Sequence, residues 1–514
     1  MNPVSVMKAY TGKIAPHYEW SQQFGKGGLE QTLGNIEEAI LKAGLGQKTV
    51  QRVHRDFVSL YDRVMKTVVK EPHALNQKIR RVLMDYSTLN FLGSAGFSTL
   101  PDYAKIMMEH EMGTVFKTLS GLFRDNRVSL NKSEARIAGE ALEILMGDTH
   151  LRFSDDMINN PFGDGFYAKG MDKVKQGFFF LNGLAPLTNI AKRLDSIMRG
   201  HTIIDYCVNV KKGVSQKGMF KTSLKFQREW LARNNISQKM IDEIAEKAGW
   251  EKSNQGLYLP NSETWLKKGV SQETLDGFRS SMNSGISNTI LMGTPADKPI
   301  AVDGVFYVPY SIGRLFGMKQ DNRVKGYSRI ENGLLSLPFQ FLSYSFAAAN
   351  KITASYAQGT VTNPIIGVLG AMGLGYMSLE IKYAMYPYIL DEMSWQDKMA
   401  RAFDASGLMA LHSDLAYSVL NNATALGYVT DENFAISPKY VVPTEGAEKR
   451  IDVAGQWIGP AGGLVMDIGL GLYQLHQEDY VEGSQTLINT VPGRSMWFTK
   501  GLFSDMRRHI RNNF

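Results

Sequence analysis

The sequence predicts a mainly α-helical protein, an elongated multi-helix assembly with at most a small β-hairpin near residues 300–308. Three observations lead to this fold class. Apolar side chains recur at intervals of three and four residues over long stretches, as they do on one face of a helix. Residues that start and stop helices stand at the ends of several of these stretches. Strand-like alternation of apolar and polar residues is sparse.

The first two helices are predicted from apolar stripes near the N-terminus. One stripe covers residues 29–40, and Gly44 follows it as a helix stop. A second stripe covers residues 50–64 with spacings of three and four. Each stripe gives a helix one apolar face, so the two helices are expected to pack against each other.

Serine residues mark the start of two further helices. Ser133 precedes an apolar run that Gly147 ends, and Ser237 precedes a run that Gly249 ends. A serine hydroxyl at the N-cap accepts a hydrogen bond from a free backbone N–H, and glycine readily takes the backbone conformation that ends a helix. Each pair therefore predicts an amphipathic helix between its two residues.

The clearest strand signal lies at residues 300–308. Apolar residues there flank Asp303 and Gly304, and an Asp-Gly pair between apolar residues favours a tight hairpin turn. The sequence thus predicts one small hairpin and no sheet domain. Loops are expected where turn-forming residues gather, at 155–164, 252–261, 293–299 and 438–446.

Length and composition are those of a globular protein with a substantial core. The chain has 514 residues, of which 44% are hydrophobic and 21% charged, with a mean hydropathy of -0.20. Three regions are predicted: an N-terminal helical domain at 1–150, a middle helical domain at 151–330 with a basic segment and the hairpin, and a glycine-rich, apolar C-terminal helical region at 331–514. No secretory signal is visible, so synthesis in the cytoplasm is expected.

One segment stands out as unusually poor in charge. Between Glu331 and Glu380 the only charged residue is Lys351. A membrane-spanning helix needs roughly 20 mainly apolar residues, but Pro364 divides the segment and leaves a short apolar run after it. A constitutive membrane helix and a buried core helix both remain open. The features favour a conditional membrane segment, folded inward until a membrane is met.

Small residues give this segment a candidate packing face. Gly367, Ala371 and Gly375 are spaced four apart, the small-xxx-small pattern that lets two helices approach closely in lipid. Tyr376 follows them and is suited to a lipid headgroup boundary or to core packing. These four residues are the predicted membrane or helix-packing site.

The excess of positive charge is modest but clustered. The chain has 57 Lys and Arg and 50 Asp and Glu, a net charge of +7. Such clusters suit phosphates of nucleic acid or of lipid, and a solvated charged face is the third interpretation. The candidate phosphate-contacting residues are Lys211, Lys212, Lys217, Lys221, Lys225 and Arg228 in the middle region and Arg507, Arg508 and Arg511 near the C-terminus.

Signatures of catalysis are missing from the sequence. Cys207 is the only cysteine, which excludes an intramolecular disulfide, and its apolar neighbours favour a buried structural thiol. Glu109, His110 and Glu111 lack the second histidine of a zinc protease motif, so their charged groups are expected to face solvent. We therefore predict no catalytic residue, no cofactor, no metal site and no enzymatic activity.

A set of short segments, from residue 90 almost to the end, follows a recognisable order. The segments are Asn90–Tyr103, Asn182–Lys192, Trp230–Ser237, Gly256–Asn261, Thr294–Pro299, Leu337–Tyr344 and Val491–Trp497. In this order the chain resembles the internal virion proteins, also called core or DNA-ejection proteins, of short-tailed bacteriophages. The resemblance is to the region downstream of any lytic transglycosylase domain.

The resemblance implies a protein made in the host cytoplasm, packed in the virion interior and later found in the host cell envelope. It implies a homo-oligomeric channel, formed with other ejection proteins and the portal, for translocating the genome across the envelope. Viral DNA, contacted non-specifically, and the bacterial inner membrane, contacted conditionally, are the other implied partners. The glutamate-centred transglycosylase motif is absent, so no wall-cutting activity is expected. Two alternatives stay open: a static capsid- or portal-associated protein, and a peptidoglycan hydrolase with an unrecognised acid pair.

Overall fold

The computed structural model describes a protein built mainly of α-helices, and this confirms the predicted fold class. In the described residues, strands form two antiparallel pairs, β1 with β2 and β3 with β4. The described residues are 14–22, 24–25, 28–65, 67–69, 71, 73–100, 102–111, 113–118, 166–214, 222–253, 256–289, 299–340, 351, 364–384, 390–391, 393–406, 447–496 and 499–513.

The elements follow one another along the chain with these bounds. The α-helices of the first half are α2 (Gly28–Lys42), α3 (Gln47–Val64), α4 (Leu75–Phe91), α5 (Asp102–Glu109), α8 (Phe166–Leu181), α9 (Leu184–Lys212), α10 (Leu224–Arg233) and α11 (Gln238–Lys247). Those of the second half are α12 (Gln272–Thr289), α13 (Tyr310–Leu315), α15 (Pro364–Tyr383), α17 (Trp395–Ala405), α19 (Ala447–His476), α20 (Tyr480–Asn489) and α21 (Lys500–Asn513). The strands are β1 (Trp250–Lys252), β2 (Tyr258–Pro260), β3 (Val305–Pro309) and β4 (Tyr327–Glu331). Short 3-10 helices are η1 (Leu92–Ser94), η2 (Phe97–Thr99), η4 (Ser262–Thr264), η5 (Leu266–Lys268), η7 (Ile300–Asp303) and η8 (Gly333–Phe339).

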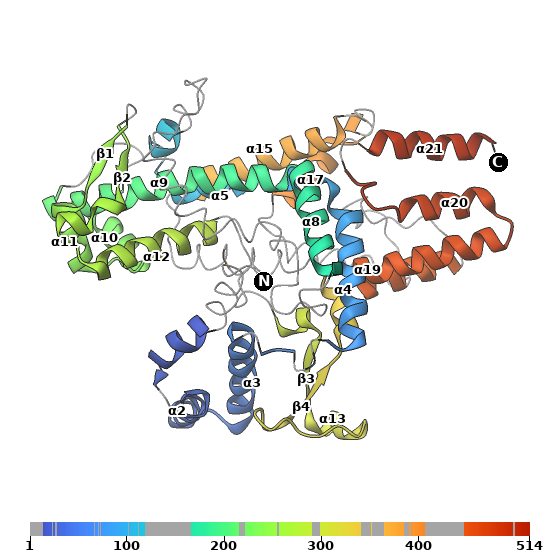
Figure 1. Ribbon diagram of the computed structural model, residues 1–514, viewed down its shortest axis with the longest axis horizontal. Coiled ribbons are helices and arrows are strands. Elements are labelled where there is room, and N and C mark those ends of the chain that lie inside the picture. The colour runs from blue at the N-terminus through green and yellow to red at the C-terminus, as the bar shows by residue number, and fades with distance from the viewer. Residues whose placement is uncertain are drawn as a thin grey trace.

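Helix α9 is the axis of the upper body (Figure 1). Helices α10 to α12 and the β1–β2 pair gather at one end of it; α5 packs on it, and α15 packs on α5. At the other end α8 and α4 descend, and α19 to α21 extend beyond them. A separate lobe below the body holds α2, α3, α13 and the β3–β4 pair.

The main hydrophobic core lies between α9 and the helices that pack on it. Trp230, Trp265 and Ile244 are almost fully buried there, together with Ile203 and Cys207 of α9. Helix α9 begins and ends next to a glycine. Gly183 (φ 84°) and Gly213 (φ 65°) both adopt the left-handed conformation, which does not continue a helix. A long helix with partners on several sides thus organises the body.

Three of the helices predicted from sequence are confirmed. The stripes at 29–40 and 50–64 correspond to α2 and α3, which pack together. The third is α11, where the Ser237 hydroxyl accepts a hydrogen bond from Met240 N at 3.4 Å as an N-cap. The helix expected between Ser133 and Gly147 lies outside the described residues.

The predicted turn at Asp303 and Gly304 is wrong. Residues Ile300–Asp303 form the 3-10 helix η7, and β3 pairs with β4, with α13 between the two strands. Asp303 is buried and its carboxylate pairs with Arg63 Nε at 3.1 Å, so it holds η7 against α3. The second pair, β1 with β2, lies in a stretch predicted as loop, and Gly256 (φ 78°) lies between its two strands.

Apolar clusters combine residues from different parts of the sequence. In the lower lobe Leu33 and Val58 pack with Val324. At the lower end of the body Met84 packs with Leu337 and Ala461. Side chains that lie hundreds of residues apart along the chain therefore share one core.

Candidate functional site

Two of the small residues predicted as a packing face, Ala371 and Gly375, face the interior of the body. Ala371 is buried, and a Cβ added at Gly375 would lie 2.2 Å from the backbone oxygen of Ala402 in α17. A Cβ at Gly370 would lie 3.5 Å from the Cβ of Ala104 in α5. The small-xxx-small face thus packs α15 against two helices of its own chain, α5 and α17. Gly367 lies in the first turns of the same helix.

The opposite face of α15 is apolar and open to solvent. Leu369 is 64% exposed and Met377 is 42% exposed. Tyr376 lies near this face, with its ring 6.2 Å from that of Trp395, and a hydrogen bond with Glu380 raises the pKa of its hydroxyl. Among the residues that the structure describes, no helix combines the length and the apolar character needed to cross a membrane.

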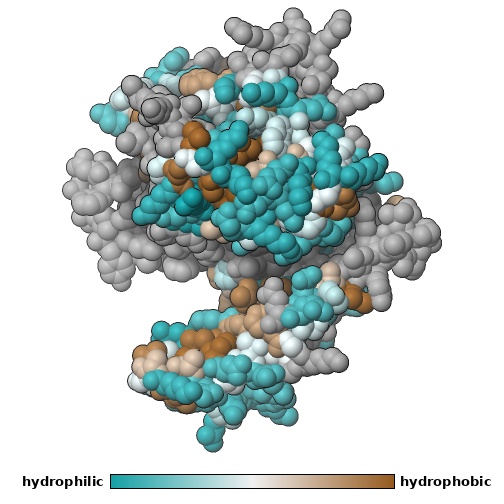
Figure 2. Space-filling model, turned by 90° about the vertical axis from the view of Figure 1, so that its left-hand side faces the viewer, coloured by the Kyte–Doolittle hydropathy of each residue, from teal (hydrophilic) through white to brown (hydrophobic). Residues whose placement is uncertain are grey.

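The basic residues of the middle region are partly neutralised by their neighbours. Lys211 Nζ lies 2.9 Å from carboxylate oxygens of both Asp242 and Glu246, and hydrogen bonds to these groups raise the pKa of Lys211. Lys212, Lys225 and Arg228 are exposed, whereas Lys217 and Lys221 lie outside the described residues. The end of the molecule that holds α10 to α12 presents mainly hydrophilic side chains (Figure 2).

The basic residues near the C-terminus all lie on α21. Arg508 and Arg511 are exposed, and Arg507 is half-buried. Helix α21 packs mainly on α20 at the outer edge of the molecule (Figure 1). The two basic groups named from sequence therefore lie far apart, on the two ends of the body.

A buried charge cluster around Arg199 was not predicted. Its guanidinium donates to Asp195 Oδ2 at 3.3 Å and to Glu109 Oε2 at 2.8 Å, and His110 Nε2 lies 2.7 Å from Asp195 Oδ1. Thr289 Oγ1 accepts from Arg199 at 2.8 Å and donates to Glu109 at 3.0 Å. We call these five residues the Arg199 cluster; it joins α5, α9 and α12.

This cluster corrects the sequence prediction for residues 109–111. Glu109, His110 and Glu111 were expected in solvent, but all three are buried. Glu111 accepts hydrogen bonds from Tyr206 at 3.2 Å and from Thr222 at 2.8 Å. The local pattern was misleading because the partners come from helices about ninety or more residues away in sequence.

Electrostatics in the cluster favour the charged forms of Asp195 and Arg199. Burial alone would raise the pKa of the Asp195 carboxyl, but Arg199 and His110 hold it below its ordinary value. Burial likewise opposes the charge on Arg199, and Asp195 and Glu109 raise the pKa of its guanidinium despite it. Gly285 makes room for this group, because a Cβ there would lie 2.3 Å from Arg199 Cζ. Closed on all sides by its own partners, the cluster is suited to holding helices together.

Other titratable groups in the body are also enclosed. Cys207 is fully buried, as the sequence predicted, and burial raises the pKa of its thiol. Within the described part of the chain, no three His, Cys, Asp or Glu side chains come together as a metal site would require.

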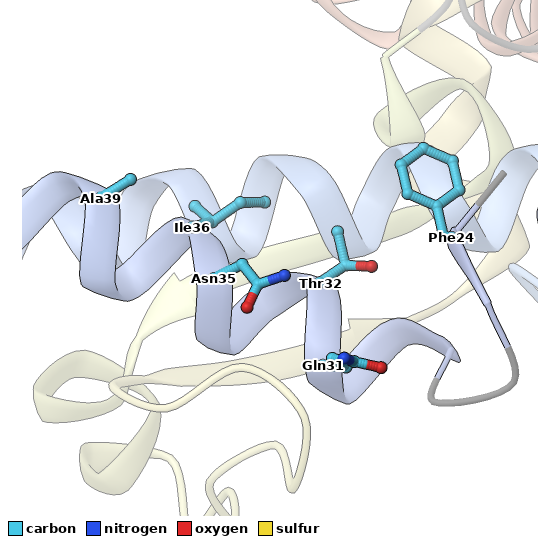
Figure 3. Close-up of a pocket in the computed structure, with 6 residues that line it drawn as sticks. All are labelled: Phe24, Gln31, Thr32, Asn35, Ile36 and Ala39. Carbon is cyan, nitrogen blue, oxygen red and sulfur yellow. The ribbon is translucent and has the colours of Figure 1, made fainter.

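A shallow hollow lies on the outer face of α2 in the lower lobe (Figure 3). Its volume is about 400 Å³. Its lining consists of Phe24, Gln31, Thr32, Asn35, Ile36 and Ala39. None of these six side chains is an acid, a base or a thiol, and none is among the candidate residues named from sequence.

Three segments that are far apart in sequence meet at one junction. Gly493 N donates to Leu89 O at 2.9 Å, and Gly93 N donates to Ser495 Oγ at 2.9 Å. Asn182 Nδ2 donates to Leu92 O at 2.8 Å. We call this contact between residues 89–96, 182–184 and 489–496 the glycine junction.

Only glycine fits at the centre of this junction. A Cβ at Gly93 would lie 2.2 Å from Met496 N, and a Cβ at Gly96 would lie 2.3 Å from Asn182 O. Both distances are to backbone atoms, which cannot move aside as a flexible side chain can. Three of the short segments whose order is noted in the sequence analysis, Asn90–Tyr103, Asn182–Lys192 and Val491–Trp497, thus meet in one tightly packed contact.

Comparison with known proteins adds no relative: no family model, no curated protein and no solved structure matches this chain.

Proposed function

We propose that this chain is an internal virion protein of a short-tailed bacteriophage, ejected with the genome and assembled with partner proteins into a conduit across the bacterial envelope. It acts in this proposal as structure and channel, without turnover of a substrate. The glycine junction is the observation that carries the proposal. The resemblance to ejection proteins rests on short segments, and three of these segments pack against one another at backbone distance.

The three segments form one packing unit in this fold. Here residues near 90, 182 and 495 depend on one another, since each supplies a backbone group or a glycine that the others need.

The setting of α15 fits a protein that changes partners. Its small face is occupied by α5 and α17, while Leu369 and Met377 leave an apolar surface exposed. Apolar helix faces of this kind are used for assembly with other chains. In the proposed function this face contacts a second copy or another ejection protein.

The first test follows the protein during infection. Virions labelled on this chain are adsorbed to host cells, and the emptied particles are separated from the cell envelope. The proposal expects the label to leave the particle with the DNA and to fractionate with the envelope. Label that stays in emptied particles would establish the static capsid- or portal-associated alternative.

A second test addresses channel formation. Purified chain is added to dye-loaded liposomes with and without the co-packaged ejection proteins, and release is expected only with the partners. The variant Leu369→Ser with Met377→Ser removes the exposed face of α15 and should abolish release. Substitution of Gly375 is not suitable for this purpose, because a side chain there meets Ala402 O inside the fold.

The matched control for that variant is Leu266→Ser, on a 3-10 helix at the other end of the body. Leu266 is 48% exposed, so the change removes a similar apolar side chain from a surface away from α15. Release that survives the α15 variant, or release that needs no partner, would contradict the proposed role of α15.

A further inference from the structure

Helix α21 carries an apolar face that its own chain leaves partly uncovered. Leu502, Met506 and Ile510 recur at intervals of four residues, and Phe503 lies beside them on the same side. Leu502 is 61% exposed and Met506 is 41% exposed. An apolar stripe on a surface helix normally faces the core. Two of its members here face solvent.

A basic face adjoins this apolar stripe. Arg507 and Arg511 lie four residues apart and so share one side of α21, and Arg508 extends that side. Asp505 is the only acidic residue in the helix. Arg508 and Arg511 are exposed, so they are available to an anionic partner.

A further arginine, Arg494, interacts with Arg507. Burial, and after it the charge of Arg507, lower the pKa of Arg494, whereas the carboxylate of Asp467 raises it. An anion bound on this side would ease the repulsion between the two guanidinium groups. The helix lies at the outer edge of the body, where a large surface can approach it (Figure 1).

We propose that α21 is an interfacial helix that binds an anionic lipid surface, lying flat with Leu502 and Met506 in the acyl boundary and its arginines on the headgroup phosphates. A helix of 14 residues is too short to span a bilayer, but it is long enough to lie in the interface. This inference deepens the proposed function and rests on it for the biological setting. It names anionic lipid as the partner of one of the two basic groups.

A lipid surface can bind both the apolar and the basic face of α21, whereas nucleic acid can bind only the basic face. A duplex offers phosphates to the arginines but no apolar layer to Leu502 and Met506. Helix α10 provides the contrast within the same chain. Its exposed Lys225 and Arg228 lie on a helix whose Trp230 is buried in the core, so only charge is presented.

The experiment measures vesicle binding by the full purified chain without partner proteins. Flotation is compared between vesicles of phosphatidylcholine alone and vesicles that also contain phosphatidylglycerol. Binding is expected only to the second kind and should weaken as salt rises. A parallel arm measures binding to a short DNA duplex by fluorescence anisotropy.

Two double variants separate the two faces. Arg508→Gln with Arg511→Gln should weaken binding to anionic vesicles by roughly 25-fold, since each surface arginine contributes about a fivefold factor. Leu502→Ser with Met506→Ser should weaken vesicle binding by about tenfold or more and leave DNA binding unchanged. Lys225→Gln with Arg228→Gln is the matched control and should leave vesicle binding unchanged. All the substituted side chains are exposed, and circular dichroism checks that each variant keeps its helix content.

The inference would be overturned by failure to bind anionic vesicles, or by vesicle binding that the Leu502 and Met506 variant does not change. It would also be overturned if α21 variants weakened DNA binding and left lipid binding intact, which would assign the helix to nucleic acid. None of these results bears on whether the chain leaves the virion during infection. The proposed function is tested separately, by the label experiment and by dye release.

Discussion

Helix α5 lies between two regions that are held together by opposite means. On one side Glu109 and Lys105 turn toward α9 and α12, where the Arg199 cluster joins the helices through buried charges. On the other side Ala104 faces α15, whose contacts are glycine and alanine at close range. Moving α9 and α12 away from α5 would leave buried charges without their partners. Moving α15 away from α5 would only expose apolar surface. The comparison indicates that α15 is the part of the body that separates at lower cost.

The largest effect on this difference between the two regions is expected from removing the charge of Arg199. Arg199→Met leaves Asp195 and Glu109 buried without their guanidinium partner, and we expect unfolding to become easier by about 3–5 kcal/mol. Urea unfolding followed by tryptophan fluorescence measures the change, since Trp230 lies beside Arg199. Lys212→Met, at the exposed end of the same helix, is the control and should change stability by less than about 0.5 kcal/mol. A loss below about 1 kcal/mol for Arg199→Met would mean that the cluster does not hold the helices together.

A smaller effect is expected on the α15 side. Gly375→Ala forces a Cβ against Ala402 O and should destabilise the protein by about 1–3 kcal/mol. The matched control is Gly373→Ala on the exposed side of the same helix, where a Cβ meets nothing within 4 Å. This control should stabilise by about 0.5–1 kcal/mol, because alanine favours helix over glycine. Equal effects of the two substitutions would show that α15 does not pack closely on α17.

The dependence of stability on pH gives the most gradual effect, which is small within any one pH unit. Burial lowers the pKa of His201 to about 3, with lesser contributions from Lys117 and His110, and its Nδ1 accepts a hydrogen bond from Tyr258 N at 3.0 Å. An unfolded histidine titrates near 6.5, so the folded state binds fewer protons between pH 6.5 and 3. Stability from this group is complete above pH 6.5 and falls toward pH 3, by at most about 1.4 kcal/mol per pH unit.

The test for His201 compares urea midpoints from pH 7 to pH 4 in the natural protein and in His201→Gln. The glutamine carbonyl keeps an acceptor near Tyr258 but does not titrate. The variant should therefore lose less stability on acidification than the natural protein. Parallel pH profiles would show that protonation of His201 does not oppose folding.

Local sequence patterns predicted the elements that depend on local interactions. The stripes of α2 and α3, the Ser237 cap of α11 and the burial of Cys207 follow from neighbouring residues, and each is confirmed. The turn at Asp303 was wrong because that carboxylate pairs with Arg63, which is far away in sequence.

The distinction between local and long-range contacts also explains which features of the charged residues could be predicted. Sequence clustering located the basic groups, but it did not reveal that Lys211 is neutralised by Asp242 and Glu246 of α11. The Arg199 cluster left one signal in the sequence: Asp195 and Arg199 stand four apart on α9, the spacing of an ion pair on one face of a helix. This spacing predicts the pair but not its burial, and the partner Glu109 can only be found in three dimensions.

The glycine junction can form only after both of its distant segments have been synthesised. Gly93 and the Ser495 hydroxyl that binds it are separated by 402 positions along the chain. A ribosome that adds about 5–20 residues per second needs roughly 20–80 s to make the intervening segment. During that interval the end of α4 has no lasting partner there, and Leu89 and Leu92 lack Met496 of their cluster. The body is therefore completed late in synthesis, and chaperones have a long window in which to bind the nascent chain.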